Sequence, residues 1–374
     1  MQRFDRSKLR FLPLGRRAGG ISIEQVAVTP LTPLPRIADE ERRRIEDIAA
    51  SIAAARAAGS CVILAFGAHL IKNGLAPLVI RMVEDGWVTH LATNGAGSIH
   101  DWEFAYQGTT SEDVRANVAS GTFGLWEETG ATINLAVATG GLDGLGYGWS
   151  VGRAVCENGI AIPSREDLLG ILREAGNRPE DTERAAAAAD LLSLVEQLNL
   201  SPGFLSVTHR HPAYSVQAAA WRAKVPFTVH PGIGYDITAT HPAFSGGAIG
   251  RGAYRDFLAY AAAVSRLTGG VHITVGSAIM APMIFEKSLS MVNNIRVRRE
   301  GCVDDFLIVV NDIQDAGWDW ENQEPPRDSP SYFFRACKTF SRMGGRFVYV
   351  RMDNRAFLQT LWHALDSPGK DRRR

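Results

Sequence analysis

Residues 62–114 contain two short apolar runs on either side of an amphipathic segment, and each run ends in glycine and polar residues. Val62–Phe66 is too short for a buried helix and rich enough in branched residues for a buried strand. Leu75–Asp85 has the apolar spacing of a helix, and Val88–Thr93 predicts a second strand. Strand, helix and strand in this order predict a βαβ unit, in which the glycines either form a nucleotide-binding crevice or only make turns.

The same alternation of strands and helices continues along the chain. Further strands are predicted at Val225–Val229, Val271–Val275, Phe306–Val310 and Phe347–Val350. This order predicts an α/β fold, with a mostly parallel Rossmann-like sheet and helices on both faces.

Three segments are expected along the chain: an extended arm over 1–38, a single domain over 39–366 and a disordered basic tail over 367–374. The glycine-rich segment Leu135–Gly152 lacks the Gly-Lys-Ser/Thr ending of a P-loop, so we expect a flexible loop there.

Composition excludes several classes of function. The 374 residues include forty basic and forty acidic ones, so the formal net charge is zero, whereas a nucleic-acid binder more often has a basic excess. There is no apolar run of about 18 residues, and the N-terminus lacks the apolar centre of a signal peptide. We therefore expect a cytoplasmic protein without a nucleic-acid or membrane partner.

Metal binding is not expected either. The four cysteines show no CxxC spacing, which argues against a zinc site and a disulfide framework. His209, His211 and His241 do not match a zinc signature.

Polar and glycine clusters accompany every confident strand, and the carboxyl ends of parallel strands meet at one edge of a sheet. The clusters are His69, Asn94 to His100, His230 to Asp236, His272, Asn311 to Asp315 and Asp353-Asn354. A dinucleotide requires such a layout, because glycines admit the backbone to the pyrophosphate and carboxylates hold ribose hydroxyls. The usual GxGxxG fingerprint is absent.

Lys338 lies among aromatic residues, between Cys337 and Thr339. In an apolar pocket the uncharged amine of a lysine is favoured and can act as a nucleophile. The alternative is a lysine that extends to solvent from an amphipathic helix, and the residues alone favour this alternative.

Several segments, in order and spacing, resemble the deoxyhypusine synthase family. They are Phe66–Ile71, Asn94–Asp101, His230–Asp236, Gly269–Ile273 and Asn311–Asp315, and Lys338 follows Pro330 at the family's spacing. The resemblance implies NAD as cofactor, an amine substrate and a homo-oligomer, either a tetramer or a dimer. It also implies transfer of an aminoalkyl group, as in polyamine chemistry, through an imine on a lysine.

The resemblance implies a role for individual residues. Lys338 would form the imine, His272 would orient or deprotonate the amine, and Asp328 would hold its distal ammonium. The implied cofactor-binding residues are Gly67, His69, Asn94, Gly95, Gly97, His100, Asp236, Gly269, Gly270, Asp312, Asp353 and Asn354.

Departures from the family's pattern leave alternatives open. His100, Tyr332 and Ala336 replace two acids and a tryptophan, which would suit an NAD-binding protein without activity. Gly97–Glu103 resembles NAD-dependent archaeal-type ornithine cyclodeaminases, which oxidise an amine to an imine and lose ammonia. The aromatic loop at Trp318 would suit an oxidoreductase acting on a sugar or nucleoside.

Overall fold

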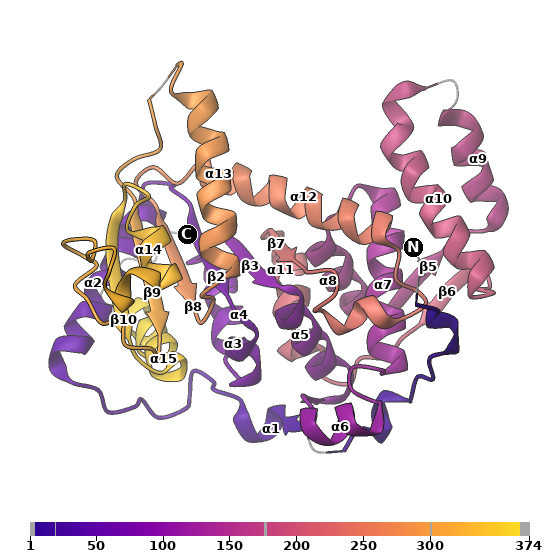
Figure 1. Ribbon diagram of the computed structural model, residues 1–374, viewed down its shortest axis with the longest axis horizontal. Coiled ribbons are helices and arrows are strands. Elements are labelled where there is room, and N and C mark those ends of the chain that lie inside the picture. Colours follow the sequence, from indigo (N-terminus) through magenta and orange to yellow (C-terminus); the bar gives the residue numbers. More distant parts are fainter. Residues whose placement is uncertain (1–3, 19, 176–177, 300, 367–374) are drawn as a thin grey trace. The chain divides into compact units, whose positions relative to one another are not determined.

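The computed structural model describes residues 4–18, 20–175, 178–299 and 301–366 (Figure 1). They form two compact units, where one domain over 39–366 was expected. The first unit comprises Met1–Gln25 and Ser98–Asp256, and the second comprises Val26–Gly97 and Phe257–Arg374. The chain passes between them within α1 (Ile23–Val26), α5 (Gly95–Gln107) and α12 (Gly246–Val264). The tail expected over 367–374 lies outside the described residues.

The second unit contains the parallel sheet that the sequence predicts. Its strands lie in the order β10-β9-β8-β2-β3, and each neighbouring pair that we describe is parallel. Their bounds are β2 Val62–Phe66, β3 His90–Asn94, β8 Val271–Val275, β9 Leu307–Asp312 and β10 Arg346–Arg351. The Rossmann-like α/β prediction is therefore confirmed.

Helices cover both faces of this sheet because the chain reverses direction within it. The chain moves from β2 to β3 through α3 (Ala68–Lys72) and α4 (Ala76–Glu84), and moves the opposite way from β8 to β10 through α13 (Met280–Arg296) and α14 (Arg335–Phe340). Right-handed crossovers in opposite directions place these helices on opposite faces.

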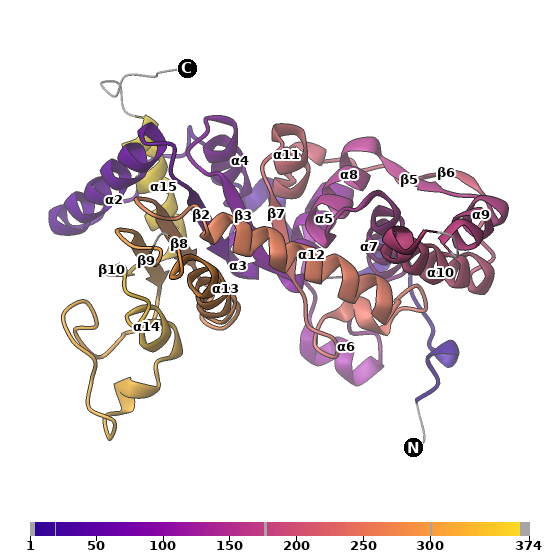
Figure 2. The ribbon, with the colours of Figure 1, turned by 90° about the horizontal axis from the view of Figure 1, so that it is seen from above.

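Two further helices, α2 (Asp39–Ala57) and α15 (Asn354–Asp366), lie on the α4 side, and α13 and α14 lie on the other side (Figure 2). The reversal of direction falls between β2 and β8. This is the topological switch point of the sheet, where open α/β sheets bind ligands.

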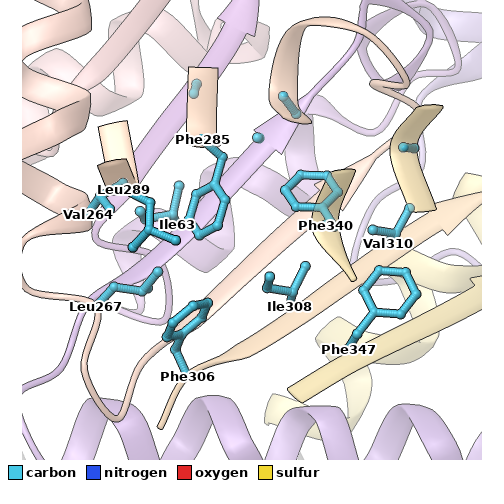
Figure 3. Packing of buried hydrophobic residues seen from close by; sticks show 14 of the residues in the cluster. Ile63, Val264, Leu267, Phe285, Leu289, Phe306, Ile308, Val310, Phe340 and Phe347 are labelled. Carbon is cyan, nitrogen blue, oxygen red and sulfur yellow. The ribbon is translucent and has the colours of Figure 1, made fainter. Parts of the chain in front are cut away.

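The α13 side of the sheet buries an aromatic core (Figure 3). Phe340 from α14 is fully buried, and its ring centroid lies 5.7 Å from that of Phe285 on α13. Both rings belong to the same buried cluster as Ile63 of β2 and Ile308 of β9. Dispersion contacts among these side chains fix the helices on the sheet.

The first unit is mostly helical, and glycines pack its helices closely. The segment expected as a loop over Leu135–Gly152 instead lies mostly within α7 (Glu127–Gly140), a short 3-10 turn and α8 (Tyr147–Glu157), so that prediction was wrong. A Cβ on Gly148 would lie 2.0 Å from the Phe227 carbonyl oxygen, and one on Gly152 would lie 2.4 Å from that of Gln217. Here glycine serves close approach and not flexibility.

The elements of the first unit are β1 Ile21–Ser22, β4 Thr109–Thr110, α6 Val114–Ser120, α7 Glu127–Gly140, α8 Tyr147–Glu157, β5 Gly159–Ile162, α9 Arg165–Ala175, α10 Thr182–Gln197, β6 Gly203–Ser206, α11 Val216–Ala223 and β7 Phe227–His230. Strands β1 and β4 pair antiparallel, as do β5 and β6. Among the described residues of both units, none of the helices has the length and apolar character to cross a membrane.

The core predicts a large difference between two phenylalanines of neighbouring segments. Phe340→Ala should lower the free energy of unfolding by about 3–5 kcal/mol, because it leaves a cavity beneath α14. The matched control Phe333→Ala removes a side chain that is 73% exposed and should change it by less than about 0.5 kcal/mol. Urea unfolding of both variants measures the difference, and equal effects would contradict this account of the core.

Candidate functional site

Two glycines contact each other at the switch point of the second unit, where β2 and β8 end. Gly67 follows β2, and its N–H donates to the Val275 carbonyl oxygen at 3.1 Å. A Cβ on Gly67 would lie 2.1 Å from the carbonyl oxygen of Gly276, which follows β8. Gly276 has a φ of 56°, a conformation that glycine adopts without strain. The two strand ends therefore meet backbone to backbone, with no room for a side chain on Gly67.

The end of β3 is attached to the same place. Thr93 donates its hydroxyl to the Phe66 carbonyl oxygen at 2.9 Å, and a Cβ on Gly97 would lie 2.1 Å from that hydroxyl. Asn94 accepts the Gly97 N–H at 2.8 Å through Oδ1. This contact satisfies one of the unpaired N–H groups at the start of α5.

The ends of β9 and β10 are joined by Asn311. Its Nδ2 donates to the carbonyl oxygens of Val350 at 3.1 Å and Met352 at 2.9 Å. Its Oδ1 is buried and has no partner among the described residues, so this edge contains an unsatisfied acceptor. Asp312 follows and accepts the Gln314 N–H at 3.1 Å.

Asp353 and Asn354 at the end of β10 have structural partners. Asp353 accepts the N–H of Arg355 at 2.9 Å and thereby caps α15. Asn354 accepts from the side-chain amide of Asn73 at 2.8 Å. The carboxylates after β9 and β10 thus behave alike, since each accepts through Oδ1 from the backbone N–H two residues further on.

The parallel strands bring most of the predicted cofactor-binding residues of the second unit to one edge. They are Gly67, His69, Asn94, Gly95, Gly97, Asp312, Asp353 and Asn354, of which His69 is exposed on α3. Their common location follows from the parallel register, and their role in binding stays a prediction.

Three predicted residues in or just before β8 do not lie at that edge. Gly269 and Gly270 precede β8 and therefore lie at its amino end. His272 is inside the strand and fully buried, with Nε2 2.8 Å from the Tyr260 hydroxyl and its ring centroid 4.6 Å from that of Phe285. Burial lowers the pKa of His272 to about 3, so the ring is a neutral core group at physiological pH.

No contact that we describe places Lys338 or Asp328 at this edge. Lys338 lies on α14 with Nζ 3.6 Å from the centroid of the Tyr332 ring, a cation–π contact. This contact fits a lysine that extends from an amphipathic helix. Asp328 is exposed in the turn before the 3-10 helix Pro330–Phe333.

The remaining predicted residues, His100 and Asp236, belong to the first unit. Asp236 accepts the Gly232 N–H at 2.7 Å, and burial raises the pKa of its carboxyl to about 6. His100 contacts Thr110, with Nδ1 2.6 Å from Oγ1, and Thr110 in turn contacts Glu103.

Glu103 is the last residue of the segment that resembles ornithine cyclodeaminases, but no role was predicted for it. Its ion-pair partner Arg17 is far away in the chain and belongs to no motif. Within the described residues, no group of three or more His, Cys, Asp or Glu side chains gathers as a metal site would require.

Comparison with known proteins gives structural neighbours only. No protein-family model matches the chain, and no curated protein matches it. The arginine dihydrolase ArgZ, from the ornithine–ammonia cycle in Cyanobacteria, aligns with a TM-score of 0.43 and 16% identity over 89% of this chain and 33% of its own.

Two further neighbours are similar. AgrE, solved with ornithine and NAD+, gives a TM-score of 0.41 at 14% identity over 89% of this chain and 34% of its own. A conserved putative LOR/SDH protein from Methanococcus maripaludis S2 gives 0.42 at 14% over 90% and 73%. The present chain thus spans about a third of the length of ArgZ and AgrE. At such identities, each activity remains that of the protein named.

The resemblance to deoxyhypusine synthases is corrected by these findings. The structural neighbours are ArgZ, AgrE and a LOR/SDH protein, and no deoxyhypusine synthase family model matches. The resemblance was based on short glycine and polar segments at strand ends, which any parallel α/β sheet requires. The polyamine transfer that it implied is dropped.

The core position of His272 predicts a specific pH dependence of stability. Its pKa falls from an ordinary 6.5 to about 3 on folding, so between these values the unfolded chain binds a proton that the folded protein does not. The free energy of unfolding should therefore fall on acidification, by at most about 5 kcal/mol from this group. His209 and His230, with pKa values lowered to about 4 by burial, act in the same direction.

The double variant Tyr260→Phe with His272→Leu isolates this contribution. It removes both partners of the buried hydrogen bond, so the fold should survive. Urea unfolding at steps from pH 6.5 to 3 should show a shallower loss of stability than in the wild type. Parallel curves for the two proteins would show that His272 is not a buried neutral group.

Proposed function

We propose that the carboxyl edge of the second unit binds NAD, and that the chain is an NAD-dependent enzyme that oxidises an amine to an imine with loss of ammonia. The observation that carries the proposal is the closed switch point, where Gly67 and Gly276 meet backbone to backbone. In doubly wound sheets, dinucleotides bind outside this point, and side-chain-free backbone lets the pyrophosphate approach.

The residues at this edge fit a dinucleotide in two ways. Gly276, which follows β8, is exposed and has no atom within 4 Å of the position of a Cβ, so its backbone would let the pyrophosphate approach. The half-buried carboxylate of Asp312 would accept from a ribose hydroxyl. When bound, NAD+ supplies the hydride acceptor that protein side chains do not provide.

The choice of an amine substrate comes from the sequence. The segment Gly97–Glu103 resembles ornithine cyclodeaminases, in which imine formation precedes loss of ammonia. Ornithine occurs together with NAD+ in the solved AgrE complex, so it is the first amine to test. If this edge binds NAD+ but no amine is turned over, the protein is instead an NAD-binding protein that lacks activity.

The cofactor part of the proposal is tested by titrating NAD+ into the protein and its variants in a calorimeter. Gly67→Ala should weaken binding at least about tenfold, because its Cβ forces the two strand ends apart. The control Gly170→Ala makes the same change on α9 with no atom within 4 Å and should bind as the wild type does.

A second variant guards against misfolding of Gly67→Ala. Asp312→Asn preserves the shape of a half-exposed side chain and should weaken NAD+ binding about tenfold to a hundredfold, the value of a hydrogen bond to a charged group. Wild-type protein that does not bind NAD+, or Asp312→Asn that binds it equally well, would contradict the proposed placement.

The reaction is tested by incubating the enzyme with NAD+ and ornithine, and then with a panel of primary amines. We expect ammonia in amounts that grow with time and, after borohydride reduction, no mass added to Lys338. An adduct on Lys338 would contradict the ammonia-releasing reaction. NAD+ binding with no ammonia from any amine would leave only the binding function.

A further inference from the structure

Strand β6 (Gly203–Ser206) has an uncovered edge. It pairs antiparallel with β5 in a two-stranded ribbon of the first unit (Figure 2). Strand β5 packs against α7 and α8 and is mostly buried, whereas all four residues of β6 are exposed. The side chains of Phe204 and Leu205 are 58% and 39% exposed. An edge of this kind presents unpaired backbone groups to any strand that can approach it.

The backbone groups of β6 that point away from β5 belong to two residues. The Val207 N–H donates to the Asn158 carbonyl oxygen at 2.8 Å, and this pair continues the register of β5 and β6. Because hydrogen-bonded and non-hydrogen-bonded pairs alternate in an antiparallel ladder, Leu205 bonds to β5 while Phe204 and Ser206 direct their N–H and C=O groups outward. No backbone hydrogen bond from another described segment reaches these outward groups.

The sequence around β6 lacks the features that usually protect an edge. Residues 197–209 contain no Lys, Arg, Asp or Glu, which would oppose the approach of a second strand. The edge strand β10 of the parallel sheet is protected, since its Tyr349 N–H donates to Glu321 Oε1 at 3.0 Å. The edge of β6 is open and uncharged, so two identical edges can approach each other without repulsion.

We propose that β6 pairs antiparallel with β6 of a second copy of this chain, about a two-fold axis at Leu205. Two identical antiparallel strands are self-complementary, as a two-fold interface requires. In this register Phe204 of each copy lies opposite Ser206 of the other, and their outward groups form four hydrogen bonds. The pairing does not depend on the proposed function.

The neighbouring registers are less suitable. An axis at Phe204 would place Ser206 opposite Pro202 of the second copy, which has no N–H to donate. An axis at Ser206 would place Phe204 opposite Thr208, which lies beyond the end of β6. Only the axis at Leu205 pairs both outward-facing residues within the strand.

The side chains fit the same register. Leu205 lies opposite Ile160, whose side chain is 3% exposed, so both are on the buried face of the ribbon. Across the axis Leu205 meets its own copy, which extends the apolar row over four strands. On the other face the large Phe204 lies beside the small Ser206 of the second copy, so the two side chains do not compete for space.

The small size of β6 determines the strength of the dimer. Four residues a side are far fewer than the roughly 20–30 of a standard interface. We therefore expect a dimer whose Kd is micromolar or weaker, and whose population rises with protein concentration.

A cysteine on the axis tests the register. Leu205→Cys is made together with Cys302→Ser, which removes the exposed native cysteine. Directly opposite residues of a non-hydrogen-bonded pair have Cα atoms about 4.5 Å apart, within the range of a disulfide. Mild oxidation of this variant should give a covalent dimer on a non-reducing gel.

The matched control is Phe204→Cys in the same Cys302→Ser background. Cysteines at position 204 of the two copies lie on either side of the axis with Cα atoms about 8 Å apart, too far for a disulfide. Random collisions would favour position 204, because Phe204 is more exposed than Leu205. Faster crosslinking at 204 than at 205, or no crosslink at either position, would overturn the pairing.

Sedimentation over a range of protein concentrations gives the second test. Leu205→Lys places like charges opposite each other, and Ser206→Pro removes from each copy an outward N–H that the ladder with β5 does not use. Each should raise the Kd at least about tenfold. The control Val118→Lys changes a 59% exposed residue on α6 of the same unit and should keep the wild-type Kd.

Circular dichroism verifies that each variant is folded before its Kd is compared. A wild-type protein that stays monomeric at millimolar concentration would overturn the proposal. A dimer that persists unchanged in folded Leu205→Lys would do so too, because its interface would then lie elsewhere.

Discussion

The contact of Gly67 with Gly276 is the constraint on which the second unit depends. It lets β2 and β8 end side by side, so that the chain can leave toward β3 on one face and toward β9 on the other. Any larger residue at position 67 would separate these ends by its Cβ alone. Gly67 is buried by this contact, whereas Gly276 is exposed and has no side chain, which is the feature that the proposed pyrophosphate position requires.

The regular parts of the fold could be predicted from the sequence, because each strand of the second unit is a short apolar run between turn residues. The prediction failed for glycine, because glycine occurs both in loops and where two elements approach closely. Gly148 and Gly152 appeared to be loop residues, yet they allow α8 to approach its neighbours. A single sequence contains no sign of which use applies, since the deciding contact is with a distant segment.

The residues of the candidate site could likewise be predicted only in part. Asn94 and Asp312 could be placed at the edge, because parallel strands align their ends. His272 was assigned a chemical role from a short segment, but the alternation of side chains along β8 directs it into the aromatic core. The pairing of Arg17 with Glu103 could not be predicted, because no local pattern connects residues on separate segments of the chain.

The interruption of the second unit by the first has a consequence for biosynthesis. On the ribosome, β2 and β3 emerge well before β8. Strand β8 is the parallel partner of β2, with Val271 opposite Val62 and Val275 opposite Phe66. Until then, the edge of a five-residue apolar strand has unpaired amide groups that can template association with other nascent chains. The second unit can therefore complete its sheet only after the whole of Ser98–Asp256 has been synthesised.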